Sequence, residues 1–327
     1  MKKILALFGT LTAVIIAAWF VGPSFLRSAG EMDDPRSEIH AAELDGVIYT
    51  TGGIGFFRTL SSCAAFDTAN ETFATCPNLP RPLHHVAMAA GDGSIWASGG
   101  YESLPFNVDP NGALFQLDLS ELEPQWREIS ALPEPLGQHA MFYHQGTVWL
   151  IGGDRNGETT GALTLYDLSE GEWVEASPMP TPRHSHAYAL DAEAGEAGFL
   201  YVTGGRSSAL GSQSRVIEAY DFASDSWTRL PDAPFDLGGH GAAVFEGRLH
   251  VFGGEDLGSG TVIQDHAVLD LANLDAGWVM VNPVSLPRHG FATARVGNTV
   301  WILGGGKRAG MRTPWSVTGT AFSLPLK

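Results

Sequence analysis

The sequence is short of cysteine, of charged residues and, most of all, of positive charge. Only two of its 327 residues are cysteines, and charged residues make up 17% of the chain. Lys and Arg together number 19 against 36 Asp and Glu, so the formal net charge is −17. Such a surface repels phosphate backbones, and we expect no nucleic-acid partner. The sparse charge also argues against long solvent-exposed helices.

Catalytic signatures are missing as well. The sequence contains no nucleophile elbow, no phosphate-binding loop and no helical metal motif. We therefore expect no cofactor and no bound metal. Whether the protein is an enzyme stays open at this point.

A largely apolar run over residues 4–21 follows two lysines at the N-terminus. This charge pattern is typical of an export signal, and the run is just long enough to cross a bilayer as a helix. We expect residues 1–23 to be either a cleaved signal peptide or a retained inner-membrane anchor, which would be the protein's only contact with the membrane. The folded part, residues 24–327, would then lie in the periplasm or elsewhere outside the cytoplasm.

The two cysteines lie in one short segment, CAAFDTANETFATC. If this segment is a hairpin, Cys63 faces Cys76 and Phe66 faces Phe73. An oxidising compartment would then allow a cross-strand disulfide. The alternative is a pair of small buried thiols.

Glycine, by contrast, is abundant, and it recurs in pairs. An apolar run ending in Gly-Gly occurs six times, with the second glycine at positions 53, 100, 153, 205, 254 and 305. A spacing near 50 residues indicates a repeat architecture. A turn signal such as Asp45-Gly46 precedes most of these runs, and a Tyr or Phe with a Trp seven residues later, as in Tyr166 and Trp173, follows several of them.

The apolar runs and turn signals of each repeat therefore predict four short strands. The second strand is apolar at nearly every position, which indicates burial on both faces. Sheets that stack face to face around an axis bury a strand in this way, so the pattern favours a propeller. The glycine pair would let this strand leave the blade in a crowded place.

These motifs resemble the kelch repeat over residues of about 37 to 322. The resemblance implies an all-β, six-bladed kelch propeller with four-stranded antiparallel blades, and we expect a monomer. The last repeat lacks its outermost strand. We predict that residues of about 25 to 32 supply this strand and close the ring.

Candidate site residues lie in two sets of loops that should meet on one propeller face. One set follows the glycine pairs, and the other precedes each first strand, where arginines follow prolines and histidines recur. Guanidinium groups there could bind a carboxylate or an acidic sugar, or they could only tie the repeats together. The ligand-binding candidates are Arg36, Arg81, Arg183, Arg206, Arg288, Arg308, Glu102, Asp154 and Glu255.

The resemblance leaves several functions open. Binding of a protein partner, or of a glycan or another small acidic ligand, is the preferred interpretation. A sialic-acid mutarotase is the alternative, with His186 or Glu255 moving protons, and a non-catalytic envelope scaffold is a third. A copper radical oxidase is disfavoured because both cysteines are committed to one hairpin. Arginines that converge on a pocket would favour a small ligand, and arginines that lock blades would favour a protein partner.

Overall fold

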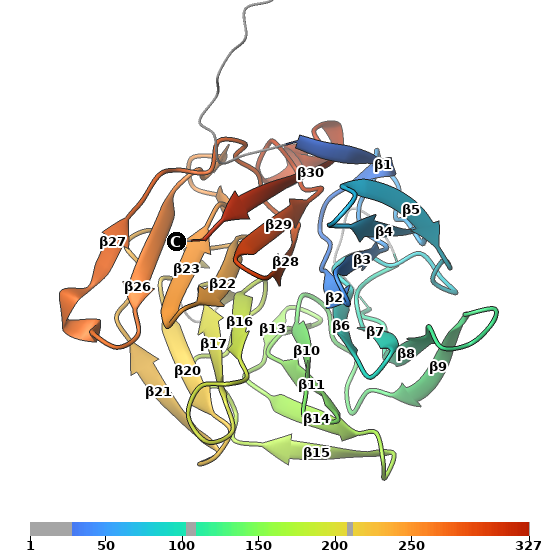
Figure 1. Cartoon of the computed structure of the whole chain (residues 1–327), viewed down its shortest axis with the longest axis horizontal. Coiled ribbons are helices and arrows are strands. Elements are labelled where there is room, and N and C mark those ends of the chain that lie inside the picture. The colour runs from blue at the N-terminus through green and yellow to red at the C-terminus, as the bar shows by residue number, and fades with distance from the viewer. Residues whose placement is uncertain (1–27, 103–108, 208–211, 327) are drawn as a thin grey trace, which may run out of the picture.

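Six four-stranded antiparallel sheets surround a central axis as the blades of a propeller (Figure 1). The computed structural model describes residues 28–102, 109–207 and 212–326. The first strand of each blade lies nearest the axis and the last lies at the rim. The predicted fold class is confirmed.

The strands follow the repeat in chain order, and blade 6 takes its outermost strand from the start of the described chain. From the axis outwards, the strands are β2 (Ala42–Leu44), β3 (Val47–Thr51), β4 (Cys63–Asp67) and β5 (Thr72–Cys76) in blade 1; β6 (Ala87–Gly91), β7 (Ser94–Ser98), β8 (Ala113–Asp118) and β9 (Trp126–Ala131) in blade 2; β10 (Ala140–His144), β11 (Thr147–Ile151), β14 (Leu163–Asp167) and β15 (Glu172–Ala176) in blade 3; β16 (Ala187–Asp191), β17 (Phe199–Thr203), β20 (Ile217–Asp221) and β21 (Ser226–Leu230) in blade 4; β22 (Gly241–Phe245), β23 (Arg248–Phe252), β26 (His266–Asp270) and β27 (Trp278–Met280) in blade 5; and β28 (Ala292–Val296), β29 (Thr299–Leu303), β30 (Thr318–Pro325) and β1 (Ser28–Arg36) in blade 6.

Short elements decorate the loops that follow the glycine pairs. These are the two-stranded ribbons β12 (Asp154–Arg155) with β13 (Glu158–Thr159), β18 (Arg206–Ser207) with β19 (Ser212–Gln213), and β24 (Glu255–Asp256) with β25 (Thr261–Val262), and the 3-10 helix η3 (Gly310–Trp315). A second 3-10 helix, η2 (Leu274–Ala276), lies between β26 and β27.

The second strand of a blade is buried on both faces, as its composition predicts. In β11, Val148 and Leu150 join the core between blades 2 and 3, whereas Trp149 and Ile151 join the core between blades 3 and 4. Alternate side chains thus serve two different cores, because successive residues of a strand point to opposite faces. The blades are held together mainly by these apolar layers.

The glycine pair after β11 is required by a close backbone approach. Gly152 and Gly153 have φ of 60° and 113°, and the N–H of Gly153 donates to the carbonyl of Arg183 at 3.0 Å. A Cβ on Gly152 would lie 2.6 Å from that carbonyl oxygen. Only glycine combines this conformation with this proximity. The pair therefore lets the chain pass between two blades and emerge on one face.

The N-terminal strand closes the ring, as predicted, although its bounds differ. Strand β1 pairs with β30 from Ser28 opposite Phe322 to Arg36 opposite Thr318, with register shifts between these ends. Strand β1 thus extends beyond residue 32. Bulges accommodate the extra residues, while Met32 stays packed in the core between blades 6 and 1. Residues 25–27 lie outside the described residues.

Tryptophans of the outermost strands connect blades 2, 3, 4 and 5 each to the blade before it. The indole N–H in each case donates to a backbone carbonyl of the preceding blade or of the segment that leaves it, at 2.8–3.0 Å. These pairs explain why the tryptophan recurs with the repeat. They are Trp126 with Pro77, Trp173 with Ala131, Trp227 with Ser177 and Trp278 with Pro231.

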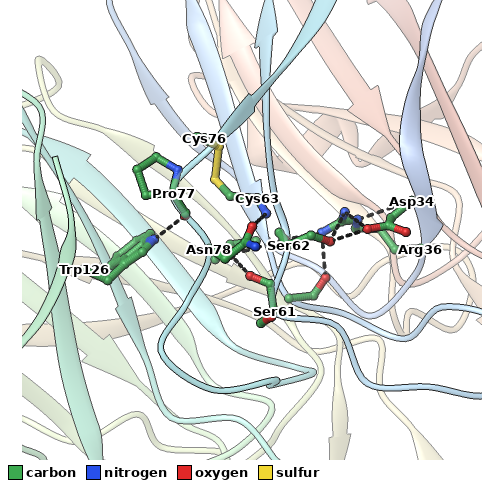
Figure 2. The surroundings of a disulfide bond; sticks show 11 residues. Asp34, Arg36, Ser61, Ser62, Cys63, Cys76, Pro77, Asn78 and Trp126 are labelled. Atoms are coloured by element: carbon green, nitrogen blue, oxygen red, sulfur yellow. Dashed lines mark hydrogen bonds and ion pairs between the residues drawn. A yellow bond between two sulfur atoms is a disulfide. The ribbon is translucent and has the colours of Figure 1, made fainter. Parts of the chain in front are cut away.

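The predicted disulfide is present and joins neighbouring strands of blade 1. Cys63 lies opposite Cys76 in the β4–β5 ladder, and their sulfur atoms are bonded. Figure 2 shows that this bond stands between two inter-blade contacts: the carbonyl of Pro77 accepts from Trp126 on one side, and Ser62 contacts the strand that closes blade 6 on the other. The disulfide therefore braces blade 1 at the point where the ring closes.

Candidate functional site at the propeller mouth

A ring of six residues surrounds the axis on the face where the glycine pairs emerge. All six have φ between 51° and 58°, and most of them donate a backbone hydrogen bond to the carbonyl of the equivalent residue in the preceding blade. We call them the mouth ring. They are Glu38, His85, Gln138, Ser185, Gly239 and Gly290.

The residues that follow the glycine pairs lie directly beside the mouth ring. Isolated backbone bridges, such as His184 with Arg206, hold them there. Side chains from neighbouring blades then meet: the Tyr101 hydroxyl donates to Asp154 at 2.8 Å, and Arg206 donates to Glu255 at 2.5 Å. The two acids, both sequence candidates, are therefore buried and already partnered.

Acid and base side chains alternate around one side of the mouth. Glu38 lies 2.9 Å from His85, and His289 lies 3.4 Å from both Glu38 and Glu255. Burial opposes ionisation of Glu38, but its attraction to His85 and His289 outweighs burial and lowers the pKa of this carboxyl below its ordinary value. This network could relay protons, and it also links blades 1, 2, 5 and 6.

Three of the candidate arginines do not face the mouth. Arg36, Arg183 and Arg288 are at most 2% exposed, and each binds groups in, or directly beside, the end of the second strand and the start of the third strand of the blade that it precedes. Arg183 makes a buried ion pair with Glu218 at 2.6 Å and also donates to the carbonyl of Val202. These arginines anchor the incoming chain to its blade.

Arg81, the fourth arginine of that set, is out of phase with the other three. Arg36, Arg183 and Arg288 stand two residues before the mouth ring, and the equivalent residue of blade 2 is the buried Leu83. Arg81 instead lies on the surface, 3.5 Å from the exposed Glu102. Arg308 is also exposed.

An apolar surface patch, which sequence reasoning missed, lies on the same face. Phe56 is 68% exposed and Trp315 is 59% exposed, and Phe57 packs edge-on against both. All members of the patch follow glycine pairs, so the pair of aromatics that begins three residues after Gly53 was the available signal. We call this surface the mouth patch; it consists of Phe56, Phe57 and Trp315, which are joined through Phe57, and of the exposed Leu257 and Met311 on the adjoining loops, where Leu257 lies beside Gly310.

A cavity of about 360 Å³ runs along the axis beneath the mouth ring. His186, a sequence candidate, lines it together with His40 and His240. Within residues 28–102, 109–207 and 212–326, no group of three His, Cys, Asp or Glu side chains could hold a metal ion.

Comparison with known proteins agrees with this architecture. The kelch motif matches residues 200–234, which include most of β17 and all of β20 and β21. The motif match and the six four-stranded blades support the kelch-repeat propeller family. This kelch propeller is 25% identical to Kelch-like protein terF of Aspergillus terreus, over 67% of its own length and 50% of that protein. It is 25% identical to beta-scruin of Limulus polyphemus, over 85% and 32%, and 27% identical to mouse Kelch-like protein 35, over 68% and 35%.

The kelch propeller thus spans a third to a half of these relatives. No helix in the described part of the chain is long and apolar enough to cross a bilayer. The apolar run at residues 4–21 lies outside the described residues.

Proposed function

We propose that this kelch propeller binds a protein partner through the mouth patch, outside the cytoplasm. The mouth patch is the observation that carries the proposal, because aromatic side chains that cluster in water are typical of protein interfaces. Its members come from blades 1, 5 and 6 and sit on the loops that a propeller leaves free. The disulfide supports an oxidising compartment, as the export segment would require.

The arginines favour this function over a small acidic ligand. Arg36, Arg183 and Arg288 are committed to backbone and side-chain partners within the blades, and Arg206 is held by Glu255. A mutarotase would need a free clamp for the sugar carboxylate and an unpaired acid or base. The buried pairing of Glu255 weighs against that role.

Site-specific photo-crosslinking tests the proposal. We expect a crosslinkable phenylalanine at Phe57 or Trp315 to give one and the same adduct in cells. The matched controls are Leu122 and Val279, which are exposed apolar residues outside the mouth patch. Trp315→Ser should weaken the affinity for the crosslinked partner by about 30-fold, equivalent to about 2 kcal/mol of binding free energy. Equal adducts at the control positions, or none at the patch, would refute the proposal.

A further inference from the structure

A groove of about 600 Å³ opens beside the mouth patch, where the propeller ring closes. It lies between the end of β1, the loop that follows the glycine pair of blade 1, and the end of η3. The exposed rings of Phe56 and Trp315 line it, together with the carboxylates of Asp33 and Asp34. We call this space the closure groove. Blades 6 and 1 therefore form it jointly.

The two rings that line the closure groove both rest on a third ring, that of Phe57. Phe56 and Trp315 each meet Phe57 edge-on, with ring centroids 4.9 and 4.5 Å away and interplanar angles of 86°. Phe57 has φ of 53°, a left-handed conformation that bulky side chains rarely adopt. It is the only apolar side chain among the described non-glycine residues with positive φ. Backbone strain of this kind is typical of ligand clamps, and here it brings three rings together.

The two carboxylates of the closure groove differ in their partners. Asp34 accepts hydrogen bonds from Arg58 at 2.6 Å and from Ser62 at 2.7 Å. Its carboxylate also lies near the buried Arg36, as Figure 2 shows. Asp33 is exposed and has no hydrogen bond or ion pair with any residue that the structure describes. Because Arg58 is paired with Asp34, the closure groove keeps one uncompensated negative charge.

Exposed aromatic rings beside an unpaired carboxylate fit a cation. The face of an aromatic ring attracts positive charge, and a carboxylate adds an opposite charge of its own. The net charge of −17 also attracts basic segments over a longer range. An apolar side chain in the same place would leave the charge of Asp33 without a counterion.

We propose that the closure groove binds a lysine or arginine side chain of the protein partner. The cation lies against the rings of Phe56 and Trp315 and close to the carboxylate of Asp33. This inference rests on the proposed function, because it names the part of the partner that docks beside the mouth patch. The partner is therefore recognised through a basic residue as well as through apolar contacts.

The surroundings of the closure groove restrict this basic segment further. Lys307, Arg308 and Arg312 are exposed on the loop that contains η3, but they do not line the groove. They would repel a run of basic residues. The segment that fits best therefore carries one basic residue between neutral or acidic neighbours.

The closure groove is formed before a ligand arrives. Pro35 and Pro314 line it and fix the backbone of two of its walls. The N–H of Gly310 donates to the carboxylate of Glu255 at 2.7 Å and ties the start of η3 to blade 5. Walls that are already ordered lose little conformational entropy when a side chain binds.

Titration of the full-length chain, labelled with 5-fluorotryptophan and followed by ¹⁹F NMR, tests the inference. Trp315→Phe identifies the Trp315 resonance. The probes are N-acetylarginine amide and N-acetyllysine amide, with N-acetylnorleucine amide as the uncharged counterpart and N-acetylglutamate amide as the anionic one. We expect both basic probes to shift the Trp315 resonance saturably. The norleucine probe should bind about tenfold more weakly because it loses the contacts with both the rings and the carboxylate.

A matched pair of variants separates the groove from the net charge. Asp33→Asn should weaken binding of the basic probes about threefold. Glu31→Gln removes one exposed carboxylate from the same strand, outside the groove lining, and should leave their binding unchanged. Phe56→Leu keeps an apolar side chain but removes the ring, and it should also weaken them about threefold.

Four results would overturn the inference. If no probe shifts Trp315, the closure groove is not a binding site. If the norleucine probe binds as tightly as the basic ones, the groove takes an apolar side chain. If the glutamate probe binds more tightly, the cations of the η3 loop select the ligand. If Asp33→Asn and Glu31→Gln weaken binding equally, only the net charge acts.

Photo-crosslinking from position 57 in cells distinguishes this inference from the proposed function. Asp33→Asn should lower the yield of the adduct, and Glu31→Gln should not. An adduct that Asp33→Asn leaves unchanged would remove the basic side chain from the account and keep the protein partner. No adduct at the mouth patch would instead contradict the proposed function, whichever probes bind in the groove.

Discussion

Removing the disulfide of blade 1 should lower the free energy of unfolding by about 3 kcal/mol. Cys63 and Cys76 are separated by 13 residues, and closing a loop of that length removes about 10 cal/mol/K of entropy from the unfolded chain. A propeller of this length unfolds with an entropy of about 0.6 kcal/mol/K. The melting temperature should therefore fall by about 5 °C.

Calorimetry on the double variant C63A/C76A, with and without reductant, checks this value. The natural chain in reductant should melt with the variant, and reductant should leave the variant unchanged. The oxidised natural chain and the variant could instead melt at the same temperature. In that case, either the β4–β5 hairpin persists in the unfolded chain or the hairpin contributes nothing to global stability. Either result would refute the loop-entropy argument.

Three further perturbations test other parts of the fold. Arg183→Met should be destabilising by about 3–5 kcal/mol in urea titrations because it strands a buried Glu218, and adding Glu218→Met should recover much of this loss. Trp173→Phe should lower the free energy of unfolding by about 1 kcal/mol by urea, because it removes one inter-blade hydrogen bond. Burial lowers the pKa of both His250 and His266 to about 4, so the unfolded state binds more protons between pH 6.5 and 4, and stability should fall as pH falls through that window. Each of the two should cost about 2 kcal/mol at pH 5, and His250→Tyr with His266→Leu should reduce the pH dependence of the urea midpoint without abolishing it, because other buried histidines such as His139 and His184 act in the same direction.

The sequence was sufficient for the fold because the fold is periodic. Six glycine pairs at a regular spacing indicate six equivalent places where a second strand leaves its blade. The apolar composition of these strands requires that both of their faces be covered. The hairpin register followed from the same logic. Cys63 faces Cys76 and Phe66 faces Phe73 because a two-residue period fixes every pair once one pair is set.

The roles of the arginines could not be predicted in the same way. A proline-arginine pair in the sequence shows where the chain enters a blade, but it does not show whether the side chain turns towards the mouth or back into the blade. For Arg183, the buried Glu218, which lies 35 residues further along the chain, and the carbonyl of Val202 decide that direction. Long-range partners of this kind have no local sequence signal. Arg81 also follows a proline, but it does not stand two residues before the mouth ring as the other three arginines do.

Phase is also what distinguishes a functional candidate from an architectural residue in a repeat protein. His139, His186 and His240 look alike in the sequence, and all three occupy the same place in their blades. Their difference arises one blade earlier, where Ser98 and Thr203 provide a hydroxyl and Ile151 does not. In a repeat protein, the informative position is therefore the one whose neighbour departs from the pattern. The hydrogen bond to the preceding blade explains His139 and His240 as architectural residues, but it does not explain His186.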